Sequence, residues 1–286
     1  MASTPPAVPA PEPGEGLALI NPGRSVTFGE AMSWIPRSFR LFWRAPLMWI
    51  LAILIFVVAA IVLQLAPIIG SIAVNILQPL YFAGFAAASR SLETGGDFEI
   101  EHLFAGFRTR STSLIIVGAI LMLGSLAILF VCLLMFMGFV GWAAITGFVG
   151  AIMSNNAQLA AEVIQGMWLP FLLVTLVSLL FFIPLLAAYW FAPYLVLMNG
   201  MKPVEAMKAS LMACISNFLQ MFVYSIAMLG LMIVVSIPVI IPILGWIFVA
   251  IAYLVLGMMS ITGVYVSYRD IFTEEISRPD SATVTL

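Results

Sequence analysis

The sequence predicts an all-α integral membrane protein with six transmembrane helices, in three repeats of one in-plane amphipathic helix followed by two spanning helices. Composition is the first observation: 63% of the 286 residues are hydrophobic and only 8% are charged, too few charges to keep a folded domain soluble. The second is that the apolar residues form six long stretches, and the third is that every base lies outside them. The net charge of −2 predicts no nucleic-acid partner.

Each apolar stretch is long enough to cross a bilayer, because a hydrocarbon core of about 30 Å needs about 20 helical residues. None of the stretches contains an ionised side chain, as expected from the cost of placing a charge in lipid. The predicted spans are Pro46–Leu65, Ile68–Ala88, Ser113–Met137, Trp168–Trp190, Phe218–Ile237 and Gly245–Val266.

The bases predict the orientation. All 11 Lys and Arg residues precede the first span, follow the last, or lie in the second and fourth connections. The positive-inside rule places these segments, and both termini, in the cytoplasm. Residues 26–273 are the predicted membrane domain. Residues 1–25, which are rich in proline and lack the basic start of a secretory signal, and residues 274–286 are predicted to be disordered cytoplasmic tails.

The connection between the third and fourth spans is glycine-rich and then polar. Residues 138–166 contain four glycines before the polar run Ser154-Asn155-Asn156. We expect an external loop with an interfacial helix. A seventh span is the alternative, and it would place Lys202, Lys208 and Arg269 outside the cytoplasm, against the positive-inside rule.

Three cytoplasmic stretches have the apolar period of a helix that lies in the membrane plane. Their apolar faces would pack on lipid or on the cytoplasmic end of the helix bundle, and the sequence leaves both open. Asp97 is placed to cap the second helix, and Pro203 to begin the third. The apolar stripes are Phe28, Met32, Ile35, Phe39 and Phe42; Ile100, Leu103, Phe104 and Phe107; and Val204, Met207, Leu211 and Cys214.

Arg37, Arg40 and Arg44 of the first in-plane helix are candidate contacts for lipid headgroups. A base near an anionic membrane surface contributes about 1 kcal/mol to binding. Membrane lipids are therefore the first expected partner, with a membrane-protein partner as the second.

Two short echoes support the repeat. Glu30-Ala31-Met32 recurs as Glu205-Ala206-Met207, and Pro67-Ile68-Ile69-Gly70 recurs as Pro242-Ile243-Leu244-Gly245. Both echoes have the same offset of 175 residues, which relates the first and third units. The middle unit matches in pattern only.

Few side chains in the sequence are candidates for a binding or catalytic site. Asn75, Gln78 and Pro79 are candidate linings of a polar, bent pocket, or they tie their helix to its neighbours. His102, the only histidine, has acids nearby, but their spacing does not place them on one helical face. The absence of charge within the spans argues against ion-coupled transport. We expect no catalytic residue, no metal site and no cofactor.

Several segments resemble a known family. They read Trp190-Phe191-Ala192-Pro193-Tyr194, Pro203-Val204-Glu205-Ala206-Met207-Lys208-Ala209-Ser210 with Ala213-Cys214 and Asn217, and Ser267-Tyr268-Arg269-Asp270-Ile271-Phe272. The last is similar to the C-terminal Tyr-Arg-Asp-Ile-Phe segment of a family of uncharacterised bacterial multi-pass inner-membrane proteins. More distantly, the chain resembles the membrane domain of some bacterial glycerophosphodiester phosphodiesterases, without their catalytic domain. The resemblance implies a bacterial inner-membrane location and no activity.

The leading functional hypothesis is a non-enzymatic inner-membrane protein that packs with lipid or with a membrane partner. The alternative is a passive or lipid-handling transporter with a pocket near Asn75 and Gln78. A third hypothesis, an enzyme acting on lipid at the inner surface, rests only on His102 and the adjacent acids.

A topology reporter tests the predicted orientation. An enzyme that is active only outside the cytoplasm should be active when fused after Gln165 and inactive when fused after Leu286, because only the first position follows an odd number of spans. Reporter activity in intact cells is the measurement. The opposite pair of activities would reject the six-span assignment.

Overall fold

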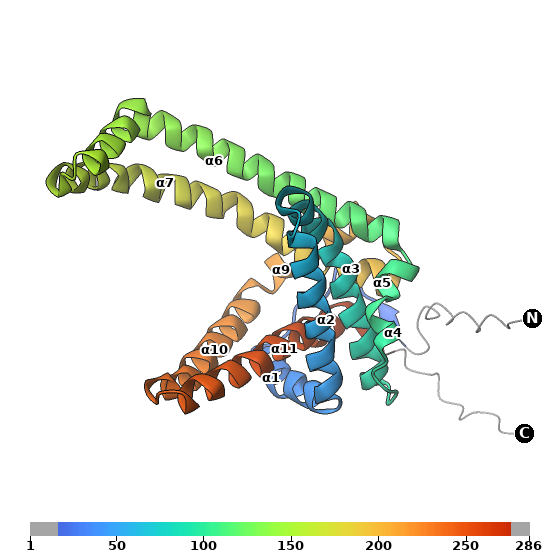
Figure 1. The fold of residues 1–286 in the computed structure, drawn as a ribbon. Coiled ribbons are helices and arrows are strands. Elements are labelled where there is room, and N and C mark those ends of the chain that lie inside the picture. Colours follow the sequence, from blue (N-terminus) through green and yellow to red (C-terminus); the bar gives the residue numbers. More distant parts are fainter. Residues whose placement is uncertain (1–16, 276–286) are drawn as a thin grey trace, which may run out of the picture. The chain divides into compact units, whose positions relative to one another are not determined.

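The computed structural model describes residues 17–275, and these are almost entirely helical (Figure 1). This confirms the predicted all-α class. The helices are α1 (Phe28–Trp43), α2 (Pro46–Gln64), α3 (Pro67–Glu93), α4 (Ile100–Leu103), α5 (Ala105–Arg108), α6 (Ser111–Met153), α7 (Ala157–Trp190), α8 (Ala192–Asn199), α9 (Pro203–Ser216), α10 (Phe218–Ser236), the 3-10 turn η1 (Ile237–Ile240) and α11 (Leu244–Phe272). Two three-residue strands, β1 (Leu17–Leu19) and β2 (Thr273–Glu275), pair antiparallel.

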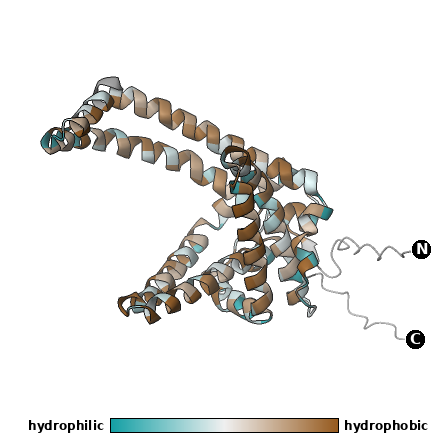
Figure 2. Ribbon diagram, in the orientation of Figure 1, coloured by the Kyte–Doolittle hydropathy of each residue, from teal (hydrophilic) through white to brown (hydrophobic). Residues whose placement is uncertain are grey.

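Six helical segments within residues 17–275 are long and apolar enough to cross a membrane, as predicted. Figure 2 shows that these helices are apolar along most of their length. The helices extend beyond the predicted apolar stretches, so that Arg90 and Glu93 fall in the last turns of α3, and Arg269 and Asp270 in the last turns of α11. The segments are Pro46–Gln64, Pro67–Glu93, Ser111–Gly141, Ala157–Asn199, Phe218–Ile240 and Leu244–Phe272.

The chain divides into two compact units, residues 1–119 with 187–286 and residues 120–186. The second unit is a helical hairpin formed by most of α6 and most of α7. Within it Gly124 of α6 lies so close to Leu185 of α7 that a Cβ atom would be 3.0 Å from the Leu185 Cδ2 atom. None of the described α7 side chains is buried, as expected of a hairpin that is surrounded by lipid.

The predicted external loop over residues 138–166 is wrong in extent. Helix α6 is interrupted at Gly141, with φ 71° and ψ 158°, and then continues to Met153. Only Ser154, Asn155 and Asn156 separate it from α7. A glycine without Cβ adopts this positive φ at little cost, so the helix breaks there and re-forms. The seventh-span alternative is not supported, because the apolar segment of α6 ends at the break.

The predicted boundaries of the terminal tails also differ from the structure. Residues 1–16 and 276–286 lie outside the described residues. Residues 17–25, however, run along the end of α11: β1 pairs with β2, the Ile20 N–H donates to the Phe272 carbonyl, and the Arg24 N–H donates to the Ile271 carbonyl. Residues 17–25 are held in place because their backbone pairs with the end of α11 and with β2. The low hydrophobicity of this segment does not indicate such pairing.

Helix starts follow local chemistry. Thr27 caps α1 in a capping box, in which its hydroxyl accepts the Glu30 N–H and the Glu30 carboxylate accepts the Thr27 N–H. Pro46 and Pro67 occupy the first positions of α2 and α3, where a missing N–H costs nothing. The predicted cap of the second in-plane helix is wrong: Glu99, not Asp97, precedes α4.

The core of the first unit lies where α1, α3, α8, α9 and α11 meet, among the ends that carry the charges. Its largest buried side chains are aromatic, including Trp34, Trp49, Tyr194, Tyr265 and Phe272. The spanning segments are far less buried, with only 6% of the apolar window of α10 inside the protein. The exposed apolar surface of these segments is suited to contact with lipid.

The two sequence echoes occupy matching positions. Glu30 and Glu205 are each the third residue of a helix, and the following Ala31 and Ala206 are fully buried. Gly70 and Gly245 each pack against the carbonyl group of the residue seven positions earlier, where a Cβ atom would overlap it. These matches support a relation between the first and third units, and the threefold repeat stays a prediction.

Substitution of the echoed glycines tests this close packing. Gly70→Ala and Gly245→Ala should each lower the free energy of unfolding by about 1–3 kcal/mol, because the new Cβ meets a backbone carbonyl that cannot move independently. Thermal unfolding in detergent, followed by circular dichroism, is the measurement. Gly257→Ala is the matched control, since nothing lies within 4 Å of its Cβ position. Equal stability of all three variants would contradict the interpretation.

Candidate functional site

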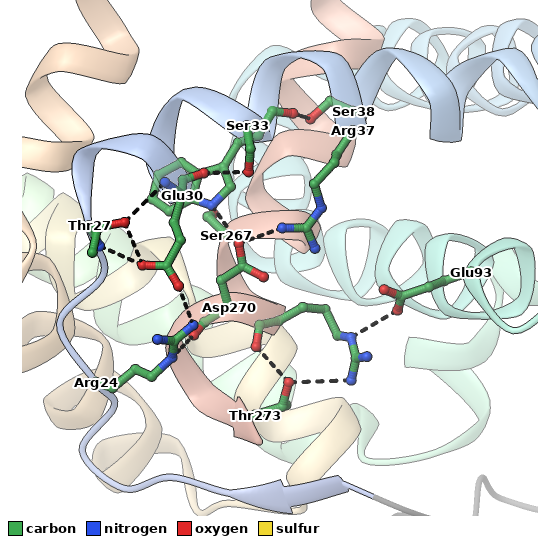
Figure 3. A network of polar contacts seen from close by, with 12 residues as sticks. Arg24, Thr27, Glu30, Ser33, Arg37, Ser38, Glu93, Ser267, Asp270 and Thr273 are labelled. Atoms are coloured by element: carbon green, nitrogen blue, oxygen red, sulfur yellow. Dashed lines mark hydrogen bonds and ion pairs between the residues drawn. The ribbon is translucent and has the colours of Figure 1, made fainter. Parts of the chain in front are cut away.

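Asp270, in the last turn of α11, is the centre of a polar network (Figure 3). Its carboxylate accepts a hydrogen bond from the Trp34 indole at 2.9 Å and pairs with the Arg37 guanidinium at 2.5 Å. Its backbone carbonyl accepts from Arg24 Nε at 2.7 Å. One residue therefore joins α11 to two positions of α1 and to the segment before α1.

The last turns of α11 also form hydrogen bonds and an ion pair with α3 and α8. Glu93, the last residue of α3, accepts a hydrogen bond from the Tyr265 hydroxyl at 2.5 Å and forms an ion pair with Arg269 Nε at 2.9 Å. The Tyr268 hydroxyl donates to the Asn199 side chain, at the end of α8, at 2.6 Å. The segment Ser267–Phe272, which carries the Tyr-Arg-Asp-Ile-Phe sequence, is thus the place where several helices meet.

Asn217 holds the segment before α1 in place. Its amide oxygen accepts the Val26 N–H at 2.8 Å, and its amide nitrogen donates to the carbonyls of Arg24 at 3.0 Å and Ala213 at 2.9 Å. Gln220 Nε2 donates to the Val26 carbonyl at 2.9 Å. Asn217 is fully buried. This role was not predicted from sequence; the available signal was an amide between two apolar helical stretches.

The acid of the α1 capping box is held in its charged form. The Thr27 backbone N–H, the Thr27 hydroxyl and the Arg24 guanidinium all donate to the Glu30 carboxylate. These interactions, the Thr27 N–H foremost, lower the pKa of Glu30 below its ordinary value. The carboxylate is therefore ionised at neutral pH and stabilises the first turn of α1.

The three arginines predicted to contact headgroups have different roles. Arg37 is paired with Asp270 and is only half-exposed, and its contact with headgroups stays a prediction. Arg44 donates from Nη1 to the Leu92 carbonyl near the end of α3 and keeps its other N–H groups free within the described chain. Arg40 is exposed and has no hydrogen-bond or ion-pair partner among residues 17–275.

Helix α1 has two apolar faces. One is buried against the bundle and includes Ala31, Trp34 and Phe42. The other, here called the α1 stripe, consists of Phe28, Met32, Phe39 and Trp43, whose exposed fractions are 47%, 39%, 42% and 63%. The rings of Phe39 and Trp43 stack with centroids 5.6 Å apart.

The predicted apolar stripe is divided between these two faces. Phe42 is buried and Ile35 packs against the bundle, whereas Phe28, Met32 and Phe39 are exposed. Packing on the bundle is therefore observed for one face, and contact of the other face with lipid stays a prediction. The two faces could not be separated from sequence because both are apolar.

The other two predicted in-plane helices differ. The second is divided into α4 and α5, and His102 Nδ1 accepts the Glu99 N–H at 3.0 Å as part of the cap. In α9, Ser210 bonds to the Ala187 carbonyl and the Phe191 N–H, and the Cys214 thiol donates to the Ala187 carbonyl at 3.5 Å. Burial raises the pKa of Cys214 to about 12, which makes the thiol unreactive at neutral pH.

The candidate pocket residues lie along α3. Asn75 is exposed and donates its amide to the Ser71 carbonyl of its own helix at 2.8 Å. Gln78 is half-buried, and Pro79 is buried. A pocket lined by these three stays a prediction. A polar cleft of about 450 Å³ lies elsewhere in the same unit, between Arg44 and Ala45 on one side and residues 92–98 on the other.

No group of three or more His, Cys, Asp or Glu side chains within residues 17–275 is arranged to hold a metal ion. The single histidine of the chain serves as a cap acceptor. The polar contacts described above mainly join helices to one another.

Comparison with known proteins agrees with the fold. A Burkholderia thailandensis protein named "Probable inner membrane protein" is 27% identical over 211 residues, which cover 71% of this chain and 73% of the relative. The chain is a multi-pass membrane protein. No family model matches it, and no solved structure matches it.

Because of these contacts, we expect removal of the buried Asn217 side chain to lower the stability of the fold markedly. Asn217→Ala should lower the free energy of unfolding by about 1–3 kcal/mol, because it leaves the buried Val26 N–H without a partner and removes the bond to the Arg24 carbonyl. It should also increase protease cleavage near residue 26. The control is Asn75→Ala, which removes an exposed amide bonded within its own helix and should have little effect. Similar behaviour of the two variants would contradict the assigned role.

Proposed function

We propose that this protein is a non-enzymatic component of the bacterial inner membrane that binds the cytoplasmic leaflet through the α1 stripe. The inner-membrane location is supported by the B. thailandensis relative and by the resemblance of Ser267–Phe272 to the Tyr-Arg-Asp-Ile-Phe segment of inner-membrane proteins. The gathering of bases at one set of helix ends supports cytoplasmic termini.

The observation that carries the proposal is the position of the α1 stripe beside the first spanning helix. Trp43 ends α1, and only Arg44 and Ala45 separate it from Pro46, the first residue of α2. The stripe therefore lies at the depth where a spanning helix enters the bilayer. Aromatic rings favour this depth because it offers apolar and hydrated surroundings together.

The charge beside the stripe supports a lipid partner. Arg40 follows Phe39 directly and is exposed without a partner among residues 17–275. A helix with bases next to a face of Phe, Met and Trp is the pattern of an interfacial helix, whose apolar face enters the headgroup boundary by about 5–10 Å. A protein partner would need a complementary acidic surface instead.

The described side chains support a structural role over catalysis. Cys214, Glu93 and Asp270 are each engaged in contacts that join segments of the fold, and His102 accepts a bond in the cap of α4. A nucleophile needs an adjacent base with a free nitrogen or carboxylate, and the described contacts direct these groups to backbone or to opposite charges instead.

Spin labelling tests the leaflet contact. In a variant with Cys132 and Cys214 replaced by Ala, a nitroxide attached at Phe39→Cys and reconstituted in phospholipid vesicles should be accessible to oxygen and shielded from a water-soluble nickel reagent. A label at Met32→Cys should behave in the same way. Power-saturation electron paramagnetic resonance measures both accessibilities.

The matched control is a label at Glu99→Cys, an exposed position at the start of α4. It should be accessible to the nickel reagent. If the labels at Phe39→Cys and Met32→Cys are as accessible to nickel as the control, α1 is not in contact with the leaflet.

A further inference from the structure

The polar cleft of the first unit lies beside the α1 stripe. Arg44 and Ala45, which connect α1 to α2, form one side, and residues 92–98, at the end of α3 and in the loop that follows, form the other. Its volume is about 450 Å³, and it is open to the exterior. Trp43 directly precedes Arg44 in the chain and is 63% exposed. The cleft is therefore at the depth of lipid headgroups.

The cleft combines a cation with an acidic side. Arg44 uses Nη1 for the Leu92 carbonyl, and its other N–H groups have no partner within residues 17–275. Asp97 also lines the cleft and is exposed, and its carboxylate has no hydrogen-bond or ion-pair partner among the same residues. Only its backbone carbonyl accepts a bond, from Ser91 at 2.7 Å. The carbonyl end of α3 adds negative potential next to Asp97.

This charge arrangement selects among ligands. A free phosphate or an anionic headgroup would meet Arg44 but would also be repelled by Asp97 and by the end of α3. A ligand with a phosphate and a primary ammonium a few bonds apart satisfies both sides. The ammonium offers three hydrogen-bond donors to a carboxylate, and the guanidinium pairs well with a phosphate.

We propose that the cleft binds the phosphoethanolamine headgroup of a phospholipid, with the phosphate at Arg44 and the ammonium at Asp97. The inference rests on the proposed contact of α1 with the leaflet, which brings the cleft to the headgroups. Phe98 also lines the cleft, and its ring packs on the buried Trp49 at a centroid distance of 4.8 Å. The acyl chains of the bound lipid would extend from the open side of the cleft.

Lipid competition in native mass spectrometry tests the proposal. The purified protein in detergent is titrated with phosphatidylethanolamine, phosphatidylglycerol and phosphatidylcholine that share the same acyl chains, and the bound lipids are counted. We expect phosphatidylethanolamine to bind about fivefold more tightly than the other two, a factor at the upper end for an exposed charge pair. Phosphatidylcholine tests the ammonium protons, because its trimethylammonium group has none.

Asp97→Asn is the decisive variant. Its carboxylate has no hydrogen-bond or ion-pair partner among the described residues, so the substitution should leave the fold intact and reduce the preference for phosphatidylethanolamine over phosphatidylglycerol about fivefold. Arg44→Gln should weaken all three lipids, but it also removes the bond to Leu92. Arg40→Gln is the matched control, and it should keep the preference because Arg40 does not line the cleft.

Three outcomes would overturn the proposal. These are equal binding of the three lipids, a preference for phosphatidylglycerol, and a preference that persists in Asp97→Asn. Each outcome leaves the spin-label experiment on the α1 stripe unaffected. A lipid-shielded label at Phe39→Cys with no headgroup preference would retain the leaflet contact and reject only the phosphoethanolamine site.

Discussion

The hydrogen-bonded ion pair between Arg37 and Asp270 is the constraint on which the rest of the charged end depends. Charges are excluded from the hydrocarbon core, so they gather in the last turns of the spanning helices. Side-chain exposure is 32% for Arg37 and 15% for Asp270, and at this degree of burial an unpaired charge is costly. The pair, with the Trp34 indole on the same carboxylate oxygen, fixes α1 against α11.

The rotation of α1 follows from these two contacts. Trp34 and Arg37 are three residues apart and lie on one side of the helix. Ser38 continues this side, where its carbonyl accepts from the Thr262 hydroxyl at 3.3 Å and Gly263 permits the close approach. With this side held against α11, Phe28, Met32, Phe39 and Trp43 stay partly exposed in the described chain. The exposure of the α1 stripe, on which the proposed leaflet contact rests, is thus a consequence of how the charged end is assembled.

The sequence predicted the features that depend on local pattern. The spans follow from apolar runs of sufficient length, and the helix α1 follows from its apolar period. Features that depend on distant partners were missed. The ion pair of Arg37 was not predicted because Asp270, 233 residues away, is not recognisable as its partner from sequence. The contacts of Asn217 and the pairing of β1 with β2 were missed for the same reason, because their partners lie far away in the sequence. The break of α6 at Gly141 was not predicted for a different reason. Several glycines lie nearby, and only Gly141 among them adopts the positive φ.

A double-mutant cycle on Arg37 and Asp270 tests the central claim most directly. The free energies of unfolding of Arg37→Met, Asp270→Asn, the double variant and the parent protein are measured in mixed micelles. A half-buried, hydrogen-bonded ion pair predicts a coupling energy of about 2 kcal/mol between the two substitutions. Additive effects, within about 0.5 kcal/mol, would show that the pair does not hold α1 against α11.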